Sequence, residues 1–142
     1  MKRTTQKNHT DDDALLKEKL LQWAQNQETV LWLDSNGHED AHSNFDGLLA
    51  VGEVSALRCT DTDKAFDKLA AYQSEIQDWI FGYFSYDLKN DLEDLISQNG
   101  DQLEFPALYF FQPQKIITIR GNTHTNVCTR SGKSISYRLS SD

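Results

Sequence analysis

Apolar residues at helical spacing predict two helices in the first half of the chain and a third further on. In residues 14–23 they recur at i, i+4 and i+7 and define one apolar face. The acidic residues 11–13 precede this segment, where they offset the positive end of a helix dipole. Thr62 is a candidate N-cap for the second helix. Helical spacing returns at residues 89–96.

Short runs rich in β-branched and aromatic residues predict strands elsewhere. The run at residues 79–86 is the most apolar and predicts a central strand, in which Gly82 indicates the close approach of another backbone. Strands outnumber helices and follow one another closely, which predicts an α+β fold with a mainly antiparallel β-sheet and two to three packed helices. The other strands are expected at 29–33, at 47–52 and 54–59 around a tight turn, and at 107–111 and 115–119 on either side of Pro113.

The two ends of the chain differ from its middle. Residues 1–13 are polar and lack periodicity before the first helix, which predicts a disordered N-terminal tail. Residues 121–142 contain five Ser and three Thr, no Glu, and a single Asp at the last position. We therefore expect the domain at residues 14–120, followed by an atypical basic, Ser/Thr-rich tail.

Length and composition narrow the class of protein. The chain has 142 residues, of which 38% are hydrophobic, and suits one domain with a real core. No apolar run approaches the roughly 18 residues of a membrane span, and the N-terminus lacks the apolar region of a secretory signal. Cys59 and Cys128 have neither a metal-binding spacing nor a disulfide framework. These features predict a cytoplasmic protein with two reduced thiols and no membrane partner.

The charge of the chain is negative and unevenly distributed. A net charge of −8 argues against a nucleic-acid partner, since such proteins are usually basic. Residues 1–106 hold 9 basic and 21 acidic side chains, whereas residues 107–142 hold 5 and 1. This asymmetry indicates a boundary between unlike segments.

The segment from His38 to His42 matches the H-E-x-x-H pattern of zinc peptidases. In those enzymes a helix presents both imidazoles to the metal, and the Glu, here Glu39, lies beside the metal-bound water. The segment lacks the apolar stripe of an amphipathic helix, and only His9 and His124 remain as histidine ligands. A solvated acidic loop is the favoured interpretation, and we expect no metal site.

Two polar clusters are expected at one end of adjacent strands. Leu33-Asp34-Ser35 ends one strand, and Ser43-Asn44-Phe45-Asp46 leads into the next. Strand ends are common positions for ligand contacts. On pattern alone, a long connection with Asx-turn caps explains the same residues.

At these residues the chain resembles the N-terminal domain of component I of the chorismate-utilising enzymes, the aminodeoxychorismate (para-aminobenzoate) and anthranilate synthases. Residues 33–35 and 43–46 resemble the L-x-S … S-R-F-D arrangement of that family with matching spacing. Residues 81–88 resemble its G-Y-x-x-Y-D-L segment, and residues 105–111 its F-P-D-L-Y strand. The resemblance covers about residues 14–120, and the ordered set of segments is more specific than any one of them.

The resemblance implies a role in chorismate metabolism. Family members convert chorismate with Mg²⁺ and with ammonia from a glutamine amidotransferase partner, and their catalytic residues lie in a larger C-terminal domain. Phe45-Asp46 is more typical of aminodeoxychorismate synthase, in folate biosynthesis, than of anthranilate synthase, in tryptophan biosynthesis. No catalytic residue is carried over, and the chain alone is expected to be inactive and to hold no cofactor.

The resemblance also implies half of a tryptophan pocket. In anthranilate synthases tryptophan is the feedback inhibitor at this site, and in some aminodeoxychorismate synthases it is a structural ligand. His42 and Asn44 occupy pocket positions where the family usually has Tyr and Arg. The implied pocket residues are Leu33, Ser35, His42, Ser43, Asn44, Phe45 and Asp46.

The C-terminal stretch departs from the family. Instead of running on into an acidic helix and the chorismate-binding domain, residues 121–142 turn basic. We expect a truncated or frame-shifted piece of a longer protein, whose missing catalytic domain is its main partner. Two other hypotheses remain: a stand-alone module that binds tryptophan or another amino acid, and a small zinc hydrolase using His38, Glu39 and His42.

Overall fold

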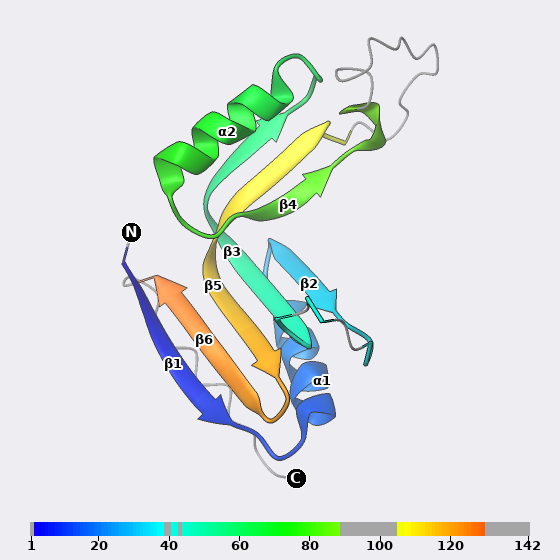
Figure 1. Cartoon of the computed structure of the whole chain (residues 1–142), viewed down its shortest axis with the longest axis vertical. Coiled ribbons are helices and arrows are strands. Elements are labelled where there is room, and N and C mark those ends of the chain that lie inside the picture. Colours follow the sequence, from blue (N-terminus) through cyan, green and yellow to red (C-terminus); the bar gives the residue numbers. More distant parts are fainter. Residues whose placement is uncertain (1, 39–40, 43, 89–104, 130–142) are drawn as a thin grey trace.

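In the residues that the structure describes, the protein folds around one six-stranded, antiparallel sheet with two α-helices (Figure 1). The computed structural model describes residues 2–38, 41–42, 44–88 and 105–129. The strand order is β1-β6-β5-β3-β2, and β4 pairs with β5 beside this path. The α+β prediction is therefore confirmed. The strands are β1 (Arg3–His9), β2 (Val30–Asp34), β3 (Gly47–Cys59), β4 (Phe81–Phe84), β5 (Leu108–Arg120) and β6 (Thr123–Thr129).

Two long strands form the spine of the sheet. β3 and β5 pair along their whole length, and both bend near the middle (Figure 1). The register shifts between Glu53 and Ser55, beside Gly52, whose φ of 74° favours glycine. The sequence predicted two strands around a turn at residues 47–59 and two strands separated by Pro113 at residues 107–119. Both predictions were wrong, because each segment is one continuous strand. The bulge at Val54 follows the pair of Glu53 and Pro113, and there each strand bends without ending.

β4 and β6 share one edge of β5. Residues 115–120 of β5 pair with β6, and residues 108–111 pair with β4. The predicted central strand at 79–86 is thus a four-residue edge strand. Gly82 is confirmed as a point of close approach, because a Cβ there would collide with the carbonyl oxygen of Tyr109.

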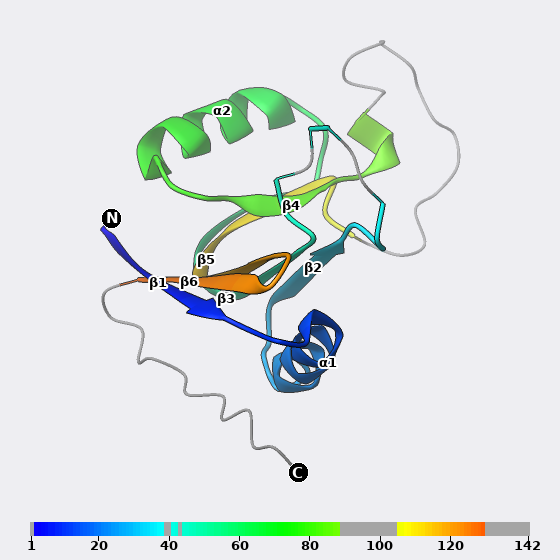
Figure 2. The same ribbon diagram turned by 60° about the horizontal axis from the view of Figure 1, so that its bottom comes forward.

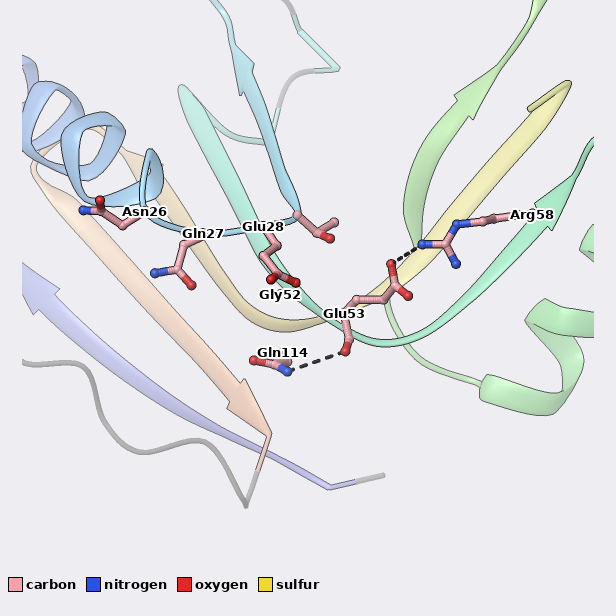
Figure 3. A pocket seen from close by; sticks show the side chains of 8 residues that line it. Asn26, Gln27, Glu28, Gly52, Glu53, Arg58 and Gln114 are labelled. Carbon is pink, nitrogen blue, oxygen red and sulfur yellow. Dashed lines mark hydrogen bonds and ion pairs between the residues drawn. The ribbon is translucent and has the colours of Figure 1, made fainter. Parts of the chain in front are cut away.

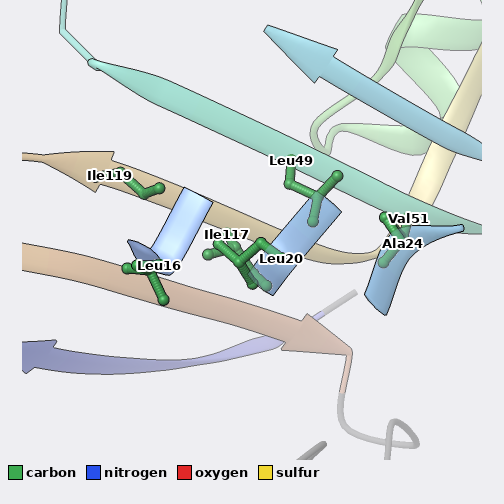
Figure 4. Close-up of a cluster of buried hydrophobic side chains, with 7 residues drawn as sticks. All are labelled: Leu16, Leu20, Ala24, Leu49, Val51, Ile117 and Ile119. Atoms are coloured by element: carbon green, nitrogen blue, oxygen red, sulfur yellow. The ribbon is translucent and has the colours of Figure 1, made fainter. Parts of the chain in front are cut away.

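Each helix covers a different half of the bent sheet. Helix α1 (Asp13–Ala24) and helix α2 (Ala65–Ile76) lie at opposite ends of it in both Figure 1 and Figure 2. Under α1, Leu16 and Leu20 pack on Ile117 of β5 within the buried cluster shown in Figure 4. Under α2, a second cluster is built from Cys59, Ala65, Leu88, Ala107 and Leu108.

A third cluster lies on the face of β3 away from α1. Leu48 and Ala50 alternate along the strand with Leu49 and Val51, which face α1, so the two pairs point to opposite sides. This cluster also holds Phe111 and Ile116, and partly buried aromatic rings pack against it. The candidate site described below lies at its margin.

The helix boundaries differ from the predicted ones at one point. Asp12 caps α1, as its side chain accepts a hydrogen bond from the Leu15 N–H at 3.0 Å. Thr62 is not the N-cap of α2. The helix begins at Ala65 after Lys64, which has a φ of 53° and forms no side-chain cap. The predicted helix at residues 89–96 lies outside the described residues.

The expected disordered tail is largely a strand. β1 pairs with β6 over residues 3–9, although its sequence has no apolar alternation. Arg3 fixes it: its guanidinium forms an ion pair with Asp78 at 2.8 Å and donates to the Pro113 carbonyl at 2.6 Å. An edge strand can be held by backbone hydrogen bonds and such an anchor alone. The alternation of apolar and polar residues in the sequence therefore does not predict β1.

The composition break near residue 121 is not a boundary of the sheet. β5 turns at Gly121 and Asn122 and returns as β6, which pairs with both β5 and β1. Threonine is β-branched and therefore favours strands, and three of the hydroxyl residues lie in β6: Thr123, Thr125 and Thr129. Residues 130–142 of the predicted tail lie outside the described residues.

Candidate functional site

The two polar clusters predicted at strand ends lie together. Asp34, the last residue of β2, pairs with Gly47, the first residue of β3. One residue further out, the Ser35 N–H donates to the Asp46 carbonyl at 3.0 Å. The chain leaves β2 through a tight turn in which Asn36 and Gly37 have φ values of 52° and 74°. The Asn-Gly turn signal is thereby confirmed.

A cavity of about 230 Å³ lies where these segments meet. It is smaller than the roughly 300–1,000 Å³ of sites for drug-sized ligands, which suits a ligand of amino-acid size. Leu33 is 54% exposed at its rim, and Leu48 is buried at its wall. Its lining residues are Leu33, Asp34, Ser35, Asn44, Phe45, Gly47 and Leu48.

Aromatic rings connect this cavity to β4. The centroids of Phe45 and Trp79 are 6.4 Å apart, and Trp79 stacks on Phe81 at 5.8 Å. Phe81 in turn meets Phe111 of the third cluster at 6.4 Å. Such tilted and stacked pairs hold each ring in place, so Phe45 is a fixed wall for the cavity.

Asp34 at the end of β2 forms an ion pair with a residue of helix α1 outside the cavity lining. The Lys17 ammonium of α1 lies 3.2 Å from the Asp34 carboxylate and 3.4 Å from the Asp46 carbonyl oxygen. The backbone N–H of Asn36 and the Lys17 ammonium lower the pKa of Asp34, against a smaller effect of burial. The pair ties α1 to the end of β2, and Lys17 itself does not line the cavity.

Asp46 plays a different part from the one implied by the resemblance. Its carboxylate accepts a hydrogen bond from the Gly121 N–H at 2.6 Å, and its own N–H donates to the Ile119 carbonyl at 2.8 Å. It therefore fastens the loop before β3 to the turn between β5 and β6, and it does not line the cavity. Its contribution to the site is to hold the backbone on which Phe45 sits.

The H-E-x-x-H segment forms no helix in its described residues. His38 and His42 are exposed in turns, and the Ser35 carbonyl accepts from the His38 N–H at 2.9 Å. Glu39 lies outside the described residues, as does Ser43 of the predicted pocket. In the part of the chain that the structure describes, no three His, Cys, Asp or Glu side chains are grouped to hold a metal ion. His42 does not line the cavity.

A second cavity, of about 500 Å³, opens at the bend of the sheet (Figure 3). The Arg58 guanidinium and the Glu53 carboxylate pair there at 2.8 Å, and the Gln114 amide donates to the Glu53 carbonyl at 3.5 Å. Polar side chains from the connection before β2 complete the lining. Ligand sites are mostly apolar with a few placed polar groups, so the smaller cavity beside Leu33 and Phe45 is the better candidate.

Comparison of the chain with protein-family models, curated proteins and solved structures finds no match. Neither helix in the described residues is long and apolar enough to cross a membrane. The site therefore has to be interpreted from its own geometry.

Sequence reasoning found part of this site. Leu33, Ser35, Asn44 and Phe45 line the cavity, as the two polar clusters suggested. It missed the ion pair by which Lys17 of α1 anchors Asp34 at the end of β2. The ion-pair partner of Asp34 could not be found by local spacing, because 17 residues separate the two.

Proposed function

We propose that this chain is the N-terminal, non-catalytic domain of a cytoplasmic aminodeoxychorismate synthase component I, and that its cavity binds the amino acid tryptophan. One observation carries the proposal. The two segments that resemble the family's pocket, at 33–35 and 44–46, are hydrogen-bonded to each other, and five of their residues line one cavity of about 230 Å³.

The chemistry of the cavity supports an aromatic amino acid as its ligand. Leu33, Phe45 and Leu48 offer apolar surface for an indole ring. Ser35 and Asn44 in its lining offer a hydroxyl and an amide for hydrogen bonds to the charged groups of the ligand. Charge-assisted hydrogen bonds of this kind are stronger than neutral ones and fix the orientation of a ligand.

In this proposal the bond-making steps belong to other parts of the enzyme. A separate chorismate-binding domain would supply the catalytic residues and hold Mg²⁺, and a glutamine amidotransferase would supply ammonia. The domain described here would bind tryptophan and pack against the catalytic domain. Phe45-Asp46 supports the folate branch, by its resemblance to aminodeoxychorismate synthases.

Calorimetric and thermal-shift titration of the purified chain with tryptophan tests the proposal. A ligand that binds only the folded state adds about 2.7 kcal/mol of stability at 100 times its Kd, and this appears as a raised Tm. The variant Leu33→Ala removes apolar wall from a half-exposed side chain and should weaken binding about tenfold. Leu15→Ala is the matched control, since Leu15 is 44% exposed on α1 away from the cavity lining.

A cooperative melt without any tryptophan-dependent shift would overturn the amino-acid site. Equal weakening by Leu33→Ala and Leu15→Ala would place binding elsewhere. A parallel titration with zinc tests the hydrolase hypothesis, which predicts stoichiometric binding that His38→Ala abolishes.

A further inference from the structure

Lys115 and Cys128 face each other across the hairpin formed by β5 and β6. They are direct partners in the antiparallel register, with Val51 of β3 on the other side of Lys115. Directly opposed residues have Cβ atoms about 4.5–5.5 Å apart and project to the same face of the sheet. The flexible four-carbon stem of lysine can therefore bring its Nζ to the cysteine Sγ.

Lys115 is buried in an unusual way for a lysine. It is only 6% exposed, and its Nζ lies 5.7 Å from the centre of the Trp23 ring. Within the described residues no carboxylate forms an ion pair with it. Buried lysines usually have such a partner, and here the face of the Trp23 ring is what the amine meets instead.

The surroundings make the amine more nucleophilic. Burial lowers the pKa of Lys115, and the nearby Cys128 opposes this only in its charged form. A lower pKa leaves a larger fraction of the amine neutral, with its lone pair available. Cys128 is partly exposed, so a small oxidant can reach its sulfur.

We propose that Lys115 and Cys128 form an oxidative cross-link, a sulfenamide bond between Nζ and Sγ, when the protein meets a peroxide. Hydrogen peroxide first oxidises the Cys128 thiol to a sulfenic acid, and one water is released. The Lys115 lone pair then attacks sulfur, the S–O bond breaks, and the departing oxygen leaves as a second water with a proton from nitrogen. Condensation of a sulfenic acid with a nitrogen nucleophile is an established branch of cysteine oxidation, and thiols reverse it.

The second cysteine provides an internal control. Cys59 is buried under α2, and its partner across the sheet is Leu108, which carries no nucleophile. The cross-link should therefore depend on Cys128 alone. Once formed, it would lock the two strands of the β5–β6 hairpin together at the end opposite the turn that Asp46 holds.

Intact-mass measurement of the peroxide-treated full chain, followed by peptide mapping, tests the proposal. The cross-link removes two hydrogen atoms, so the mass falls by about 2 Da, and dithiothreitol restores it. The same loss should occur in Cys59→Ser and be absent in Cys128→Ser. In Lys115→Arg the sulfenic acid should persist, with a gain of about 16 Da and labelling by dimedone.

Peptide mapping gives a direct reading even if a variant folds poorly. The expected product in the unsubstituted chain is a single linked species that joins the peptides holding Lys115 and Cys128. A cross-link that forms equally in Lys115→Arg would overturn the proposal. So would oxidation of the unsubstituted chain that yields only disulfide-linked dimers or a sulfinic acid at Cys128.

Discussion

Gly82 lies at a close backbone approach between β4 and β5. It pairs with Phe110, and an added Cβ would collide with the Tyr109 carbonyl oxygen and lie 2.7 Å from the Phe110 Cα. Backbone atoms cannot turn aside as a flexible side chain can. Any larger residue must therefore push the four-residue strand β4 away from the sheet, together with the aromatic rings at 79 and 81 that lead to the cavity.

Gly82→Ala should lower the free energy of unfolding by about 3 kcal/mol, at the upper end of the usual cost of overpacking. Urea denaturation followed by tryptophan fluorescence measures the change. Gly47→Ala is the matched control, since its added Cβ would only touch Lys17 and Trp32 at 3.4 Å. We expect a change within about 1 kcal/mol for it. Similar losses in the two variants would contradict the steric explanation.

At the residue scale the sequence was informative where chemistry is local. A glycine within an aromatic run predicted close packing, and Asn36-Gly37 predicted a turn, because both depend on a residue's own conformational limits. Asp46 shows the opposite case. Its carboxylate partner, the Gly121 N–H, is 75 residues away, and no local pattern reveals it.

At the scale of elements, β1 depends on a buried ion pair rather than on an apolar face. The side chains of Arg3 and Asp78 are 7% and 6% exposed, and the Gln112 amide also donates to Asp78 at 2.8 Å. Burial acts to raise the pKa of Asp78, but the hydrogen bonds from Arg3 and Gln112 outweigh it and lower the pKa. They join the first strand, the connection before β4 and the bend of β5.

Arg3→Ala should destabilise the protein by about 3–5 kcal/mol, because it leaves the buried Asp78 carboxylate without its cationic partner. Amide hydrogen exchange should show the loss of protection first in β1. Arg58→Ala is the control, since its pair with Glu53 is 53% exposed on the arginine side and should contribute at most about 1 kcal/mol.

The double variant Arg3→Met/Asp78→Leu sharpens this test. It removes both charges and should recover most of the stability that Arg3→Ala loses. If the double variant is less stable than Arg3→Ala, the ion pair itself, rather than the cost of an unpaired charge, holds the strand.

At the scale of the whole molecule, the sheet makes global stability depend on pH through one histidine. His124 is 4% exposed in β6, between Asn8 of β1 and Ile119 of β5. Burial lowers the pKa of His124 below its usual 6.5, because the charged form loses hydration there. Its protonation is therefore linked to unfolding of the three strands that meet around it.

The free energy of unfolding should fall as the pH drops below about 6.5. In that range the unfolded chain binds the proton that the folded chain excludes, so the stability contributed by neutral His124 is complete above 6.5 and is lost on acidification. Urea denaturation between about pH 7.5 and 5 measures the slope. His124→Gln should remove it, and His9→Gln, at an exposed position, should leave it unchanged. Equal slopes in the two variants would contradict this assignment.

The sequence by itself determined the α+β class, helix α1 with acidic residues at its start and the turn at 36–37. Each depends on spacing, capping or conformational limits within a few residues. Only the tertiary structure decided that β3 and β5 are continuous bent strands, that residues 3–9 pair with β6, and that Lys17 meets Asp34. These features arise from contacts between distant residues, where backbone pairing and buried charge outweigh local pattern.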